Sequence, residues 1–331
     1  MDKLKNYLTK DRIMTFLSKN VLILVLLVLV VVFTIIKPVF FSGRNFTNIL
    51  QQNSYMIVAV CGVAIIMISG GTDLSVAYEI ALSGVIMAAG MMWWGLSIPF
   101  SILLGLIVAV VLGVINGLLS ITLKIHPMMI TLATMTIFKG VTFLITKSQS
   151  IFNLPDSFKF IGQGSFIGIP VAFWITIVVF IFTSLLLHKT YFGRHVYAVG
   201  SNFQASHLAG INVGLVKVLA FAIGGFLIGI ATVLMLARTG SANANMATGA
   251  EFNAITACVL GGISLKGGEG KPWGAVIGVL ILGVLANGMQ LVGFDLNAQY
   301  IAKGVLLIMA IGFDTYQRSR NAVKVKVKVV N

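Results

Sequence analysis

The sequence IPVAFWITIVVFIFTSLLL, residues 169–187, contains no charged residue and is long enough to cross a membrane as a helix. At about 1.5 Å per residue, roughly 20 residues span the ~30 Å of hydrocarbon in a bilayer. A second apolar run, VLAFAIGGFLIGIATVLMLA, occupies residues 218–237, and a polar stretch separates the two. The sequence therefore predicts two membrane-spanning helices joined by a polar connection.

The rest of the chain is similarly apolar and carries little charge to cover a water-facing surface. Of its 331 residues, 58% are hydrophobic and only 10% are charged, whereas soluble domains carry about 25% charged residues. A membrane β-barrel would instead show alternating segments of about 10 residues. We therefore predict an all-α, polytopic membrane protein with about ten transmembrane helices. The expected spans are residues 21–41, 50–69, 74–93, 97–121, 128–146, 169–188, 214–237, 251–265, 273–292 and 299–313.

Lysine and arginine are distributed unequally between the connections of these spans. With the N-terminus in the cytoplasm, sixteen fall in inner segments and five in outer ones, and such an excess marks the cytoplasmic side. The net charge of +14 therefore reflects membrane orientation and does not indicate nucleic-acid binding. We predict a cytoplasmic N-terminal segment 1–20, a transmembrane domain 21–313 and a cytoplasmic basic tail 314–331 that is frayed, so that both termini are cytoplasmic.

The polar stretch GRHVYAVGSNFQASHLAGI, residues 193–211, lies in the largest internal cytoplasmic segment, residues 189–213. Asn202 is a favourable N-cap, the sequence FQASHLA is compatible with a helix, and Gly210 suits the C′ position. We expect a short surface helix parallel to the membrane. It is either an ordinary connection or a binding surface. Most connections between helices have only about 4–6 residues, and this segment is much longer, which favours a binding surface.

The same stretch resembles the cytoplasmic coupling loop of permease subunits in bacterial ATP-binding cassette (ABC) importers of the ribose, xylose and galactoside type. That family's pattern is G-R-x-x-Y-A-x-G-x-N-x-x-A-A-x-x-x-G-I. The sequence matches it at Gly193, Arg194, Tyr197, Ala198, Gly200, Asn202, Ala205, Gly210 and Ile211. It departs at Ser206, where a second alanine is usual, and at Gln204, where an acidic residue is common. Two further stretches, residues 70–85 and 249–288, resemble other patterns of the family in the same order.

The resemblance implies an architecture, a function and a set of partners. The architecture would resemble that of the ten-helix vitamin B12-type permeases, and the function would be import of a sugar or sugar-like solute by alternating access. Two permeases would pair as a homodimer or with a homologue. Two cytoplasmic ATPase subunits would bind the coupling loops, and an extracytoplasmic solute-binding protein would deliver the solute. This chain would lie in the bacterial cytoplasmic membrane. It would bind no cofactor itself, because the partner ATPase subunits would bind ATP and Mg²⁺.

The resemblance also implies which residues act in coupling. Gly200, Ala205, Ser206 and Gly210 would allow close contact with the ATPase, Asn202 would cap the helix, and Gln204 and His207 would reach the partner. The implied ATPase-coupling residues are Gly193, Arg194, Tyr197, Gly200, Asn202, Gln204, Ala205, Ser206, His207 and Gly210.

Catalytic and metal-binding motifs are not found. The stretch GGISLKGGEGK, residues 261–271, fails as a phosphate-binding loop, because Leu265 replaces the first glycine and Pro272 replaces the hydroxyl residue. It is either a tight cytoplasmic turn or an interrupted helix that lines a pathway. The histidines lack ligand spacing, and Cys61 and Cys258 are best explained as small buried hydrophobic residues. We therefore expect no metal site and no enzyme activity in this chain.

Four polar residues within or beside the spans are candidates for a solute pathway: Asp73, Glu79, Asn116 and Asn287. Asp73 could instead cap the following helix, and the two asparagines, each followed by glycine, could instead mark helix packing. Glu79 lies further into its span, where a charge costs about 2.5–3.5 kcal/mol on insertion scales, so it must snorkel, be protonated, pair with a basic residue or face water. Its possible partners in the sequence are Lys139 and Lys303.

Two other functional classes remain as alternatives. An ion- or proton-coupled secondary transporter, acting without an ATPase, would need several acidic residues within the membrane, and only Glu79 clearly qualifies. A membrane-embedded enzyme would need paired catalytic groups within spans, and the sequence contains none.

Overall fold

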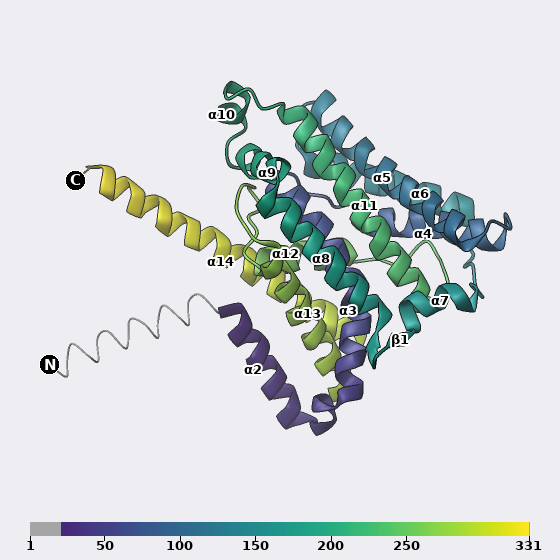
Figure 1. The fold of residues 1–331 in the computed structure, drawn as a ribbon. Helices are drawn as coiled ribbons and strands as arrows, with labels where there is room; N and C mark the ends of the chain where they lie inside the picture. The colour runs from purple at the N-terminus through teal and green to yellow at the C-terminus, as the bar shows by residue number, and fades with distance from the viewer. Residues whose placement is uncertain (1–20, 331) are drawn as a thin grey trace.

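The computed structural model describes residues 21–330, and this part of the chain is almost entirely helical (Figure 1). Among the described residues, six helices are long and apolar enough to cross a membrane, which confirms a polytopic membrane protein. They are α3 (Gly43–Ile68), α5 (Ile98–Thr122), α6 (Pro127–Thr146), α8 (Val171–Lys189), α11 (Val213–Thr239) and α13 (Pro272–Val292). The other four expected spans contain shorter apolar helices: α2 (Val21–Ile36), α4 (Val76–Met92), α12 (Ala250–Leu260) and the first part of α14 (Leu296–Val330).

Several helix bounds differ from the expected spans for local reasons. The first span was expected to reach residue 41, but α2 ends at Ile36 and the short 3-10 helix η1 (Pro38–Phe41) follows. Pro38 causes this break, because proline disfavours helical geometry in the residue before it. The expected segment 1–20 lies outside the described residues. The tail beyond residue 313 was expected to fray, yet α14 continues as a helix to Val330, and this stretch contains neither glycine nor proline to end it.

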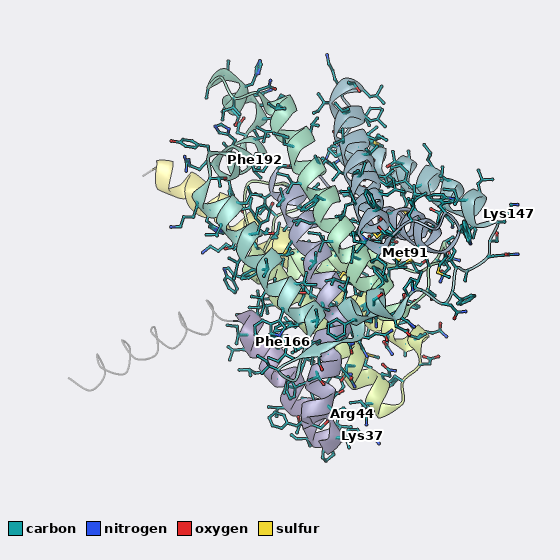
Figure 2. The ribbon with its side chains drawn as sticks, turned by 45° about the vertical axis from the view of Figure 1, so that its right-hand side comes forward. Lys37, Arg44, Met91, Lys147, Phe166 and Phe192 are labelled. Atoms are coloured by element: carbon teal, nitrogen blue, oxygen red, sulfur yellow. The ribbon has the colours of Figure 1, made fainter. Side chains whose placement is uncertain are left out.

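The short elements lie at the two ends of the bundle. Helices α9 (Tyr191–Ser201) and α10 (Phe203–Leu208) are at one end, while α7 (Asp156–Gln163) and the hairpin of β1 (Ser165–Phe166) and β2 (Ile169–Pro170) are at the other (Figure 1). Figure 2 shows the same separation, with Phe192 of α9 in the upper part of the view and Phe166 of β1 well below it. Any partner that binds α9 and α10 is therefore remote from one that binds the hairpin.

Helix α11 is the centre of the bundle, where it packs against both α5 and α3. Glycines make these crossings close. A Cβ atom on Gly225 would lie 2.5 Å from the carbonyl oxygen of Ala109, and one on Gly62 would lie 2.8 Å from that of Gly224. A Cβ atom on Gly113 would overlap the carbonyl group of Phe221. Within a bilayer, such close backbone approach provides the van der Waals contact that holds helices together.

We expect Gly113→Val to destabilise the bundle by about 1–3 kcal/mol, the usual cost of overpacking, because the new side chain meets backbone atoms of α11 that have no room to move. The measurement is thermal unfolding of the purified protein in detergent. Gly140→Val is the matched control, since Gly140 lies in α6 and a Cβ atom there would have no neighbouring atom within 4 Å. Equal melting temperatures for the two variants would show that α5 and α11 do not depend on this contact.

Two segments of irregular backbone interrupt the helices. Residues 69–75 join α3 to α4, and residues 71–75 are buried. Residues 240–249 join α11 to α12, which has 11 residues and is therefore only about 16 Å long, too short to cross the bilayer. The eighth expected span, residues 251–265, is thus a short helix rather than a full crossing. Irregular backbone at membrane depth occurs where it is buried in protein or lines a cavity, so these interruptions indicate where to search for a functional site.

Candidate functional site

The polar stretch after α8 folds as two helices rather than the single short helix expected. The hydroxyl of Thr190 accepts a hydrogen bond from the Gly193 N–H at 3.1 Å and caps α9. Asn202 has extended backbone geometry, which ends α9, and its Oδ1 accepts from the Ala205 N–H at 2.9 Å to cap α10. Gly210 has a φ of +82°, as required of a C′ residue. The capping roles expected of Asn202 and Gly210 are therefore confirmed.

The end of α9 is fixed to two other parts of the chain by a junction of four glycines, Gly70, Gly200, Gly267 and Gly268. The Gly268 N–H donates to the carbonyl oxygen of Ile68 at 2.8 Å, which joins the loop after α12 to the end of α3. A Cβ atom on Gly200 would overlap Ile68 and lie 2.5 Å from the Gly268 nitrogen. This glycine junction therefore links α9, the break between α3 and α4, and the loop between α12 and α13.

Tyr197 adds a second connection between α9 and that loop. Its hydroxyl donates to the carbonyl oxygen of Gly270 at 2.8 Å. Partial burial raises the pKa of Tyr197, so the hydroxyl keeps its proton and remains a donor at neutral pH. The stretch GGISLKGGEGK is thus a turn, which was one of the two interpretations of its sequence. The same stretch contacts α9 through Gly268 and Gly270.

The coupling residues implied by the sequence divide into two groups in the structure. The first group faces this chain's own backbone or interior and consists of Gly193, Tyr197, Gly200 and Ser206. The second group is exposed and consists of Arg194, Asn202, Gln204, Ala205, His207 and Gly210. Close contact of Gly200 and Ser206 is therefore made within the chain, whereas the second group is available to a partner.

Two apolar residues of α10 were missed by the sequence reasoning. Phe203 is 54% exposed and Leu208 is 87% exposed at the tip of the α9–α10 end. Large apolar side chains within an otherwise polar surface segment indicate a binding surface. This signal was already present in the sequence. The comparison with the family pattern did not reveal the two residues, because the pattern specifies no residue type at either position. We call Phe203, Gln204, His207 and Leu208 the α10 surface.

A buried polar cluster connects α4, α5 and α6 next to the glycine junction. Asp73 Oδ1 accepts from the Ser75 N–H at 2.8 Å and from the Ser75 hydroxyl at 2.6 Å. Ser75 Oγ also lies 3.0 Å from Glu79 Oε1. Asn116 Nδ2 donates to Ser75 Oγ at 2.8 Å and to Glu79 Oε1 at 2.9 Å. Thr134 donates to Asn116 Oδ1 at 2.6 Å, so three helices are joined by polar contacts within the membrane.

This arrangement changes the interpretation of the pathway candidates. Asp73, Glu79 and Asn116 are fully buried, and their side chains make hydrogen bonds within this cluster. Glu79 is paired with neither Lys139, which lies over the Tyr78 ring, nor Lys303. Asp73 stabilises the turn before α4 through Ser75 instead of capping the helix itself.

Asn287, the fourth candidate, has a packing role. Its Oδ1 accepts from Asn45 Nδ2 at 2.9 Å, between α13 and α3. The adjacent Gly288 leaves room for the ring of Phe33 in α2. The structure therefore shows that Asn287 and Gly288 take part in helix packing, as one of the two interpretations of this Asn-Gly pair predicted.

Two cavities lie elsewhere, among α3, α12, α13 and α14. One has a volume of about 80 Å³ and the other about 280 Å³. Both are lined by Asn253 and Lys303. None of the four pathway candidates lines either cavity. Lys303 was considered only as a partner for Glu79, and Asn253 was not singled out, because an isolated amide in an apolar segment gives no pattern.

Comparisons with known proteins give a consistent result. Residues 45–311 match the family described as "Branched-chain amino acid transport system / permease component". The chain is 36% identical to the ribose import permease protein RbsC of Haemophilus influenzae, over 95% of this chain and 98% of that protein. It is 39% identical to RbsC of Bacillus subtilis, over 87% and 90% of the two chains, and 35% identical to the L-arabinose transport system permease protein AraH of Escherichia coli, over 90% of each.

No solved structure matches the chain. The family match covers most of the sequence, and the relatives are covered over nearly their whole lengths. The chain therefore belongs to this family of permease components, and it is a transport subunit of an ABC importer rather than an enzyme.

Proposed function

We propose that the chain forms the membrane pathway through which an ABC importer moves a pentose or a related sugar into a bacterial cell. Relatives similar over nearly their whole lengths are named as permeases for ribose and L-arabinose. The family description names branched-chain amino acids, but the individual relatives favour a sugar. Both termini would be cytoplasmic, and the architecture would be that of the vitamin B12-type permeases with ten spans.

The observation that carries the mechanism is the α10 surface. It presents Phe203 and Leu208 to solvent, while the preceding helix is fixed to the glycine junction. We propose that one of two cytoplasmic ATPase subunits binds this surface, and that ATP with Mg²⁺ is bound and hydrolysed there, in the partner. Because the ATPase binds the two conformations unequally, it shifts the equilibrium between them.

Movement of α9 and α10 would be transmitted through Gly200 to the break between α3 and α4 and to the loop before α13. Those segments contact the helices that surround the two cavities. A solute-binding protein would act at the opposite end, near the β1–β2 hairpin, and a second copy of the chain or a homologue would complete the pathway. An ATPase-independent secondary transporter is disfavoured, because Glu79 lies outside both cavities.

We expect Phe203→Asp combined with Leu208→Asp to abolish retention of the ATPase subunit while membrane insertion continues, because two charges replace the apolar contact. The measurement is co-purification in mild detergent after co-expression with the partner subunits. Phe166→Asp is the matched control, since Phe166 is 61% exposed in the hairpin at the opposite end. Normal ATPase retention by the double variant, or equal loss in the control, would contradict the assignment of the α10 surface.

A further inference from the structure

The cavity beside α12 and α14 adjoins a smaller one that reaches the middle of the long helix α3, because Asn253 and Lys303 line both. The larger cavity, of about 280 Å³, is lined by Gly249, Phe252, Asn253, Thr256, Tyr300, Lys303, Gly304 and Leu307. The smaller one extends toward Asn53 in α3, which at about 1.5 Å per residue lies roughly 15 Å along that helix from Gly43. Transporter solute sites commonly occupy this depth, where an interrupted helix begins, and the short α12 begins at this cavity.

Some polar side-chain groups of the lining have no partner among the residues that the structure describes. The side chains of Asn253 and Lys303 make no hydrogen bond or ion pair with other residues in the described range 21–330. Asn53 Nδ2 donates to the Ile49 carbonyl oxygen at 2.7 Å, whereas its carbonyl oxygen has no partner in that range. These three side chains are only partly buried, so a ligand or water can reach them and supply the missing hydrogen-bond partners.

The chemistry of the lining distinguishes between solute classes. Amides from Asn53, Gln52 and Asn253 both donate and accept, as sugar hydroxyls do, and the rings of Phe252 and Tyr300 offer apolar faces. No acidic side chain is among the described lining residues. An amino acid would therefore find Lys303 for its carboxylate but no carboxylate for its ammonium group. A neutral polyol brings no charge of its own, and its hydroxyl oxygens can accept hydrogen bonds from the Lys303 ammonium group.

We propose that this cavity, with Asn253 and Lys303 at its centre, binds the solute in transit and selects a neutral polyhydroxylated molecule the size of a pentose over an amino acid. The volume agrees with a small solute, because sites for drug-sized ligands measure about 300–1,000 Å³. The inference rests on the proposed function and adds to it the residues that contact the solute.

The test uses the whole complex, reconstituted in proteoliposomes with its ATPase and solute-binding protein. Uptake of radiolabelled D-ribose, L-arabinose and L-leucine is measured together with ATP hydrolysis. Asn253→Leu and Lys303→Met are expected to slow sugar uptake about tenfold, through loss of hydrogen bonds to the solute, while ATP hydrolysis persists. The controls are Asn245→Leu, at an exposed position in the segment before α12, and Lys139→Met, in α6 away from the cavity.

The outcomes separate the two levels of the proposal. If the unaltered complex takes up sugar with ATP and both cavity variants match their controls, the solute site is wrong and the function stands. If the unaltered complex takes up no sugar with ATP, or only leucine, the proposed function itself is wrong. An assay that does not depend on transport uses Asn253→Cys with a charged methanethiosulfonate reagent, because Cys61 and Cys258 are buried. D-ribose should slow labelling and L-leucine should not, and labelling unaffected by ribose would overturn the site.

Discussion

Gly200→Val is expected to uncouple ATP hydrolysis from solute uptake. The new Cβ atom would overlap Ile68 on one side and lie 2.5 Å from the Gly268 nitrogen on the other. Both neighbours are backbone atoms, and the Gly268 N–H is already bonded to the Ile68 carbonyl oxygen. Neither can move without breaking that bond, so α9 must separate from the glycine junction.

The size of the effect follows from the contact that is lost. Overpacking costs about 1–3 kcal/mol, and a coupling free energy of that size changes the linked equilibrium about 5–150-fold. We therefore expect ATP-driven uptake to fall by that factor while the ATPase still binds the α10 surface. The measurements are uptake in proteoliposomes and co-purification of the ATPase.

Gly214→Val is the control for this prediction. Gly214 lies just after the polar segment, and a Cβ atom there would meet its nearest neighbours at ordinary distances of 3.5 Å or more. The control should transport normally. Full uptake by Gly200→Val would mean that the glycine junction does not transmit motion, and loss of the ATPase together with uptake would mean that the substitution disrupts binding rather than coupling.

Much of the fold could be predicted because the relevant signals are local. A run such as residues 169–187 has few alternatives to a membrane helix, since its backbone groups must be satisfied within the segment. Asn202 and Gly210 could be assigned as caps for the same reason, because the partners of a cap lie within three or four residues. The errors arose where two local preferences compete, as at Pro38, which ends α2 early.

The candidate sites were harder, because their partners are remote in sequence. Nothing local indicates that Gly200 packs between residues 68 and 268, or that Asn253 and Lys303 share a cavity. Glu79 was correctly recognised as unusual, but its partners could not be found, because the search was for a basic residue and the structure supplies a serine and an asparagine. Long-range contacts between neutral polar groups leave no pattern in a single sequence.

Glu79→Leu is expected to destabilise the protein by about 1–3 kcal/mol, because one buried N–H of Asn116 loses its acceptor on Glu79 and an unsatisfied buried group costs about that much, whereas the Ser75 hydroxyl still donates to Asp73. Glu79→Gln should be much milder. Ser75 has one hydroxyl proton but faces oxygens of both Asp73 and Glu79, and a hydroxyl donates to one acceptor at a time. A glutamine amide supplies the additional N–H that this cluster lacks. Thermal unfolding in detergent measures both variants.

A double-mutant cycle distinguishes a connected network from independent contacts. Asn116→Leu alone should cost about as much as Glu79→Leu, since it removes the bond from Asn116 to Glu79 and the bond from Thr134 to Asn116. The double variant should cost clearly less than the two together, because replacing both members of a buried polar pair removes the orphaned groups as well as the bond. Additive losses would show that the two residues act separately. A loss in Glu79→Gln as large as in Glu79→Leu would show that the cluster requires the carboxylate, in which case Glu79 has a role beyond joining α4 to α5.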